Sequence, residues 1–300
     1  MAKKNKNWLR LRWVLVLFLT FLASLSLLLF YLVQGKNIAL LHPRGYIAHQ
    51  QYSLMLFVVA ILLIIGIPAL VTLYIVAWRY RESNPKTVMS EHKASKSLVA
   101  TIWIVPTFFM IVISVVMWPA THKLAPQKSI ASENKPLTIQ VISLRWKWLF
   151  LYPEQGIATV NFIQLPINTP VEFEMTADEV PMSSFWIPNL GGQLYTMTSH
   201  VNRLNLMANT IGDYPGSTPE INGAGFTGMK FTARVSSDAD FNQWVKKTSQ
   251  SQNILDQNSY KELLKPSEAN PVVLYSDFDG TLYDSVIMKY AGSAEGHSGH

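Results

Sequence analysis

Two aspartates near the end of the chain are arranged for chemistry. Asp277 and Asp279 are separated by one residue at the end of the largely apolar run VVLYSDFDGT, residues 272–281. Paired carboxylates can supply a nucleophile and a general acid or base. His297 and His300 give a weaker metal-binding signal, because two imidazoles on a Gly/Ser/Ala segment are more typical of a solvated chain end.

The run of residues 272–281 resembles the first motif of haloacid-dehalogenase-type phosphatases. That resemblance implies that Asp277 is a phosphoryl-accepting nucleophile and Asp279 a general acid/base. The phosphatase fold needs a long α/β body after the motif, and only residues 282–300 follow it here. We therefore expect a strand and a turn of a larger domain, without phosphatase chemistry.

The absence of cysteine from all 300 residues removes several further chemistries. It excludes disulfides, thiolate metal centres, a cysteine nucleophile and a lipid anchor on cysteine. Disulfides therefore give no information about the cellular compartment of the protein, which has to be inferred from membrane topology.

The distribution of charge and hydropathy indicates a membrane protein. The chain is 49% hydrophobic and 15% charged, with a formal charge of +6. Residues 1–118 contain 12 Lys or Arg and 2 Asp or Glu, whereas residues 119–300 contain 13 and 17. Because the basic excess lies in the apolar half, the pattern favours the lipid bilayer as a partner and excludes nucleic acid.

Three stretches without Asp, Glu, Lys, Arg or His are long enough to cross a bilayer: residues 13–34, 50–78 and 97–121. We predict a signal sequence or first anchor at 1–35, with the retained anchor preferred. A transmembrane hairpin follows at 36–122, with spans at about 54–78 and 98–118. Basic residues before the first stretch and between the other two predict that both segments are cytoplasmic and that the chain after residue 120 lies outside.

Residues 123–290 have the pattern of an all-β sandwich with short C-terminal helices, and residues 291–300 that of a disordered tail. The predicted strands are 137–143, 146–152, 159–162, 171–176, 204–208 and 229–235. Capping patterns at Ser237 and Ser259 predict two helices.

Aromatic residues alternate in the second predicted strand. Trp146, Trp148, Phe150 and Tyr152 are spaced by two, which places all four on one face of a strand. We interpret this face as packing, either in the core or, for Trp146 and Trp148, at an interface with a partner.

Two stretches, PMSSFWIPNLG (181–191) and TPEINGAGFTGM (218–229), resemble subunit II of the haem-copper respiratory oxidases. Further matches are ALLHPRG (39–45), RWKW (145–148) and GFTGMKF (225–231). The resemblance covers about residues 36–270 and implies a cupredoxin-like outer domain.

The same resemblance identifies the positions that hold a dinuclear copper centre in cytochrome c oxidases. Ser183 stands at the first histidine position, Thr218 and Asn222 at the two cysteines, and Phe226 at the second histidine, while Glu220 and Met229 are retained. A copper electron-transfer site needs soft thiolate and imidazole ligands. We therefore expect no metal, no cofactor and no catalytic residue in this chain.

A cupredoxin-like domain without copper ligands resembles the quinol-oxidising branch, the cytochrome bo-type ubiquinol oxidases. The resemblance implies a non-catalytic subunit of a proton-pumping complex in the bacterial inner membrane, with a periplasmic outer domain. Subunits I, III and IV are the implied partners, and subunit I holds the haems, copper and quinol. The alternatives are a cytochrome c oxidase subunit II with a degraded copper site and a membrane-anchored cupredoxin-like scaffold.

The chain departs from the family pattern at two places. Lys36 stands where many relatives have a lipidated cysteine, so that anchor cannot form. A glutamate that relatives carry just before the tryptophan of the last span is missing near Trp103, which leaves Glu91 as the candidate for proton entry.

Overall fold

The computed structural model describes residues 38–81, 95–180 and 182–294, together with positions 20, 24, 26–28 and 31, which are helical. Most of the first apolar segment therefore lies outside the described residues, as do Glu91, His297 and His300.

The chain divides into two compact units, residues 1–42 and residues 43–300. The first unit contains one turn of 3-10 helix, η1 (Ala39–Leu41). The elements described below belong to the second unit.

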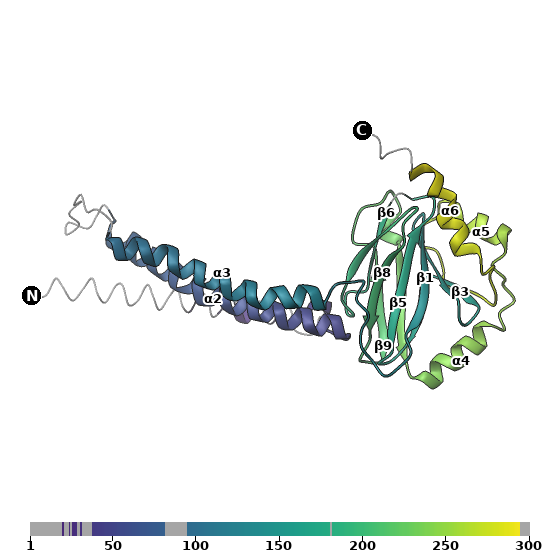
Figure 1. The fold of residues 1–300 in the computed structure, drawn as a ribbon, viewed down its shortest axis with the longest axis horizontal. Coiled ribbons are helices and arrows are strands. Elements are labelled where there is room, and N and C mark those ends of the chain that lie inside the picture. Colours follow the sequence, from purple (N-terminus) through teal and green to yellow (C-terminus); the bar gives the residue numbers. More distant parts are fainter. Residues whose placement is uncertain are drawn as a thin grey trace, which may run out of the picture. The chain divides into compact units, whose positions relative to one another are not determined.

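Two long apolar helices, α2 (Tyr46–Arg79) and α3 (Lys96–Lys123), open the second unit (Figure 1). A helix satisfies the backbone N–H and C=O groups within the segment itself, as an apolar segment in lipid requires. Both are long and apolar enough to cross a membrane. The predicted spans at 54–78 and 98–118 both fall within these helices.

Contacts at the helix ends show where α3 begins and how the two helices pair. The Ser95 hydroxyl caps α3 by accepting a hydrogen bond from the Leu98 N–H at 3.2 Å. At the other end of α3, Lys123 Nζ lies 5.8 Å from the centroid of the Tyr46 ring, at the first residue of α2. The end of α3 therefore lies beside the start of α2, as a helical hairpin requires.

The rest of the unit is a sandwich of two β-sheets, as predicted. The six-stranded sheet has the order β11-β3-β2-β1-β5-β8 and the five-stranded sheet the order β4-β10-β9-β6-β7. The pairs β1–β5 and β4–β10 are parallel. The strands are β1 (Leu137–Leu144), β2 (Lys147–Tyr152), β3 (Ile157–Val160), β4 (Phe162–Pro166), β5 (Pro170–Ala177), β6 (Met182–Trp186), β7 (Gln193–Met197), β8 (Asn202–Met207), β9 (Gly212–Ser217), β10 (Lys230–Ser236) and β11 (Val273–Tyr275).

The predicted strand at 159–162 is wrong, because two strands in different sheets meet there. Asn161 lies between β3 and β4 with a φ of 56°, a left-handed conformation that asparagine tolerates well. Its side chain accepts a hydrogen bond from the Trp148 N–H at 2.9 Å and donates one to the Asn270 carbonyl at 3.1 Å. Asn161 is thus the point at which the chain changes sheets.

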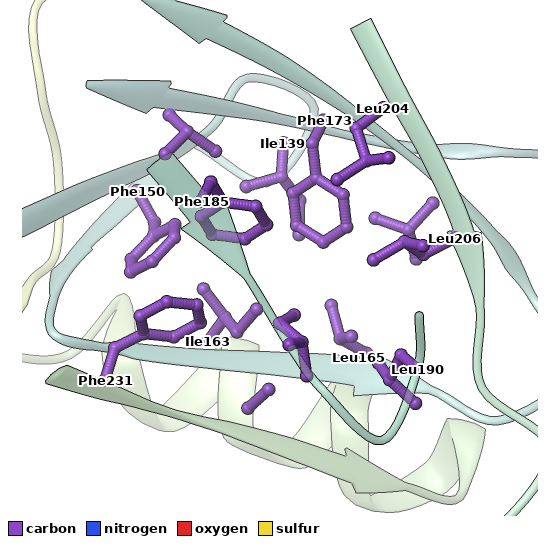
Figure 2. Close-up of a cluster of buried hydrophobic side chains, with 14 of the residues drawn as sticks. Ile139, Phe150, Ile163, Leu165, Phe173, Phe185, Leu190, Leu204, Leu206 and Phe231 are labelled. Atoms are coloured by element: carbon purple, nitrogen blue, oxygen red, sulfur yellow. The ribbon is translucent and has the colours of Figure 1, made fainter. Parts of the chain in front are cut away.

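The space between the sheets is filled by aromatic and aliphatic side chains (Figure 2). The Phe185 and Phe231 rings stack with centroids 5.1 Å apart, and Trp148 meets Phe185 edge to face at 5.3 Å. Phe150 lies 5.2 Å from Phe231. Offset and edge-on contacts of this kind stabilise a core beyond the area that they bury.

A second hydrophobic cluster covers the other face of the six-stranded sheet. Leu149 and Leu151 of β2 point into it, whereas their neighbours Trp148, Phe150 and Tyr152 point into the first. The covering residues come from the C-terminal segment and include Leu255, Tyr260, Tyr275, Tyr283 and Val286.

Three short helices complete the fold, and two of the predicted details change. The helix α4 (Asp238–Thr248) is capped by Ser237 as expected, but α5 (Gln257–Leu264) is capped by Asp256, which accepts from the Ser259 N–H at 2.8 Å. The predicted tail at 291–300 begins too early, because α6 (Leu282–Ala294) continues through its first four residues.

Two buried ionic groups attach the C-terminal segment to the sheet. Lys147 is 2% exposed and donates through Nζ to the carbonyls of Leu263 and Lys265, both at 2.8 Å, at the end of α5. Burial lowers the pKa of Lys147. A buried ammonium is tolerated only when such partners replace its water.

The second group is Asp178, which is 1% exposed. Its carboxylate accepts from the Tyr260 hydroxyl at 2.6 Å, the Tyr290 hydroxyl at 2.6 Å and Lys289 Nζ at 2.8 Å. Lys289 also donates to Glu179 at 2.8 Å. One carboxylate of the sandwich therefore holds both α5 and α6.

The hairpin joins the sandwich through backbone hydrogen bonds. The Arg44 N–H donates to the Asn189 carbonyl at 2.8 Å and the Ala48 N–H to the Leu190 carbonyl at 3.1 Å. Gly45 forms a bridge with Ala208. Ile47, in the first turn of α2, belongs to the core between the sheets. The start of α2 is thus part of the sandwich.

We predict that Gly191→Ala weakens this junction. Gly191 has a φ of 89°, and an added Cβ would lie 2.8 Å from the Ala48 nitrogen. We expect a loss of about 1–3 kcal/mol in the free energy of unfolding of the outer domain. Gly156→Ala is the control, since Gly156 has a φ of 66° but no atom within 4 Å of the added Cβ. Chemical denaturation of the solubilised chain should show the larger loss for Gly191→Ala; equal losses would contradict a tight junction.

We also predict that attachment of the C-terminal segment weakens at alkaline pH. Burial first, and then the Asp178 charge, raise the pKa of Tyr260. Burial first, and then the hydrogen bond to Asp178, raise the pKa of Tyr290. Burial lowers the pKa of Lys289, but its bonds to Asp178 and Glu179 outweigh burial and raise it. Groups whose pKa is raised on folding contribute stability that is complete below their unfolded pKa of ~10 and is lost as the pH rises through the folded value.

Thermal unfolding of the solubilised chain between pH 8 and pH 11 measures this effect. Tyr260→Phe should be less stable at pH 8, because it loses a hydrogen bond to Asp178, yet should lose stability less steeply above pH 10. The prediction fails if the two curves run parallel.

Candidate functional site

Three of the residues that the sequence resemblance matches to copper-ligand positions meet in the structure. Ser183 lies on β6, Asn222 in the loop of residues 218–229 between β9 and β10, and Met229 just before β10. Asn222 Nδ2 donates to Ser183 Oγ at 2.9 Å and lies 3.2 Å from Met229 Sδ. Ser183 is 2% exposed and Met229 is fully buried. One carboxamide therefore joins a hydroxyl and a thioether from two other segments.

The beginning of the same loop is fixed by further hydrogen bonds. The Ser184 N–H donates to Thr218 Oγ1 at 3.3 Å, and the Thr218 N–H donates to the Met229 carbonyl at 3.4 Å. The Tyr195 hydroxyl of β7 donates to the Glu220 carboxylate. Thr218 and Glu220 therefore lie near Asn222 and act as hydrogen-bonding residues of the loop.

Phe226 is the first residue of the short helix η2 (Phe226–Gly228). Its side chain is a hydrocarbon ring and has no atom that could bind a metal. The donor set is then two hydroxyls, an amide, a carboxylate used by Tyr195 and a thioether that faces the Asn222 amino group. Copper electron-transfer centres need thiolates and imidazoles. Across the described part of the chain, no group of three or more His, Cys, Asp or Glu could hold a metal ion. These residues do not fit a dinuclear copper centre.

Trp146 does not belong to the aromatic face predicted for β2. It lies in the turn between β1 and β2 with a φ of 61°, so the two-residue alternation begins only at Trp148. Its indole packs against the loop: a Cβ added at Gly223 would lie 3.0 Å from the Trp146 ring, and one added at Gly225 would lie 2.5 Å away. Only glycine leaves room for this contact.

The prediction that Trp148 is an interface residue is wrong. Its side chain is fully buried between the sheets and contacts Phe185 and Phe231, so no partner can reach it. Trp146 is only half-buried and stays available. The two tryptophans therefore have different surroundings despite their spacing.

Asp277 and Asp279 form a turn, as expected, after the strand β11. Asp277 Oδ1 accepts from the Phe278 N–H at 2.8 Å, and Asp279 Oδ1 accepts from the N–H and hydroxyl of Thr281 at 2.9 and 2.7 Å. The bonds from Thr281 lower the pKa of Asp279. Both carboxylates are used to organise the turn that leads into α6.

Several polar residues of this domain cannot be recognised from the sequence. Lys147 and Asp178 gave no signal, because a single charge in a β pattern normally points to solvent. Tyr195 gave none either, since β7 has no alternation. Asn222 was recognised only as a lost ligand, and its role as a donor depends on contacts that spacing does not encode.

Parts of the chain are similar to a known family model and to a solved structure. The family described as "COX Aromatic Rich Motif" matches residues 250–293, the segment that carries α5, β11 and α6. Among solved structures, the periplasmic domain of subunit II of cytochrome oxidase from Bradyrhizobium japonicum aligns with a TM-score of 0.37 and 22% identity, over 39% of this chain and 96% of that one.

Curated relatives match almost the whole chain. The cytochrome bo(3) ubiquinol oxidase subunit 2 of Pseudomonas putida is 43% identical over 270 residues, which is 90% of this chain and 86% of the relative. The ubiquinol oxidase subunit 2 of Acetobacter aceti is 37% identical over 262 residues, 86% of this chain and 85% of the relative. At this identity and coverage, the chain belongs to the family of quinol oxidase subunit 2, a subunit of respiratory oxidases.

Proposed function

We propose that this chain is the copper-free subunit II of a proton-pumping quinol oxidase, which oxidises ubiquinol and reduces oxygen to water. The names of its relatives support the quinol substrate of the complex. The observation that carries the proposal is the pairing of Ser183, Asn222 and Met229 by hydrogen bonds at positions that would have to supply metal ligands. The chain itself then performs no electron transfer.

Its role is to support the assembly and stability of subunit I, which would hold the haems, the copper of the oxygen-reducing centre and the quinol. The hairpin offers large exposed apolar surfaces on both helices, including Leu62, Ile64, Trp103 and Trp118. Such surfaces need lipid or apolar partner helices. Subunits III and IV are further partners in this proposal.

We place the chain in the bacterial inner membrane as a multi-pass protein with a periplasmic outer domain. The basic residues before the first apolar segment and between the spans support this orientation. Trp146 is a proposed contact with a partner subunit. Glu91 is a proposed proton-entry residue.

Purification of the complex in mild detergent tests the function. We expect haem-bearing subunits to co-purify, oxygen uptake to depend on ubiquinol, and the electron paramagnetic resonance spectrum to lack a dinuclear copper signal. Copper added to the separately purified chain should produce no thiolate-to-copper absorption, because the chain has no thiolate.

Each alternative gives a different result in the same experiment. Oxidation of reduced cytochrome c without a dinuclear copper signal would indicate a cytochrome c oxidase subunit II with a degraded copper site and contradict the proposal. A chain that purifies alone and without haem would indicate a free-standing scaffold.

A further inference from the structure

The loop of residues 218–229 has little reason to be ordered by its own sequence. It contains Gly223, Gly225 and Gly228, and glycine has the largest conformational entropy to lose. Its internal backbone bonds form two short turns, from Gly223 to Phe226 and from Gly225 to Met229, and one bond that joins its two ends, from Thr218 to Met229. Contacts with the rest of the domain must therefore hold the loop in place.

Those contacts are unevenly distributed along the loop. Thr218 and Glu220 fix its first three residues to β6 and β7. Asn222 makes the side-chain hydrogen bonds that fix its middle, from one amino group to Ser183 Oγ and Met229 Sδ. Ser183 lies on β6 and Met229 directly precedes β10. The Asn222 side chain therefore connects the middle of the loop to β6 and to the start of β10.

The chemistry of Asn222 is that of a donor. Its Oδ1 is buried and has no hydrogen-bond partner among the described residues, so only the amino group contributes bonds. Both acceptors are almost completely buried, where water competes least for the bond. Loss of the donor would leave Ser183 Oγ without a hydrogen-bond partner at a site from which water is excluded.

We propose that the Asn222 amino group is a hydrogen-bonded cross-link that keeps the loop of residues 218–229 on the sandwich. It does so at a position where copper-bearing relatives have a metal-bridging cysteine, and in this respect the inference rests on the proposed function. The cross-link also holds Gly223 and Gly225 against the Trp146 indole. The order of the loop then depends on an amide and needs no metal.

Hydrogen exchange on the complete oxidase tests this inference. Asn222→Leu keeps the approximate volume of the side chain and removes its donor. The amides of Phe226, Gly228 and Met229 should then exchange about tenfold faster, equivalent to about 1.4 kcal/mol. Amides of β1 and β2 should be unchanged. Asn242→Leu, at an exposed site on α4, is the matched control and should leave the loop unchanged.

Unchanged loop protection in Asn222→Leu would overturn the cross-link. If that variant fails to fold, Ser183→Ala and Met229→Leu together remove both acceptors and should produce the same faster exchange. A double-mutant cycle between Asn222→Ala and Ser183→Ala adds a direct measure: the two effects should be less than additive, and full additivity would overturn the contact.

The same measurement with copper separates the inference from the proposed function. Exchange in the loop of the unmodified complex should be the same with and without added copper. Slower exchange with copper would contradict the copper-free function, whereas the variants alone decide the cross-link.

Discussion

Strand β2 is buried on both faces, and the arrangement of the outer domain depends on that burial. All six of its residues are buried: Trp148, Phe150 and Tyr152 lie between the two sheets, and Lys147, Leu149 and Leu151 lie beneath the C-terminal segment. A strand in the middle of a sheet can be apolar on both sides only if a layer covers each side. The five-stranded sheet provides one layer, and the residues of α5, β11 and α6 provide the other. Lys147 and Asp178 then set where the second layer attaches, since each buried charge needs the partners that α5 and α6 supply.

This arrangement gives a physical reason for the aromatic-rich motif matched at residues 250–293. Tyr260, Tyr275 and Tyr283 fill the layer over the sheet, and the Tyr260 hydroxyl also meets Asp178. A phenol serves both purposes, since its ring is apolar and its hydroxyl can donate to a buried carboxylate. The pair Asp277 and Asp279, which resembled a phosphatase motif, belongs to the turn that directs α6 back over this layer.

The sequence predicted those parts of the fold that depend on local periodicity. The two apolar helices and the strands β1, β2, β5, β8 and β10 follow from runs that are uniformly apolar or alternate. The strands β6, β7 and β9 could not be predicted, because β6 and β9 carry serine, glycine or proline and β7 does not alternate between apolar and polar residues. Trp146 and Asn161 were misplaced for another reason. Each adopts a left-handed conformation that interrupts an apparently continuous pattern. At the candidate site, residue types predict that copper ligands are absent, but the contact of Asn222 with Ser183 joins residues 39 positions apart and required the structure.

The junction of α2 with the sandwich has a consequence for the time course of biosynthesis. Arg44 and Ala48 bind the backbone of residues 189 and 190, and Gly45 pairs with Ala208. Because the ribosome makes the chain from its N-terminus, both hairpin helices are complete before these partners exist. The first turn of α2 must therefore wait, with Ile47 outside any core, until the strands up to β8 have been translated and folded. Formation of this junction is therefore a late event. The helices take up their final position against the outer domain only after that part of the domain has folded.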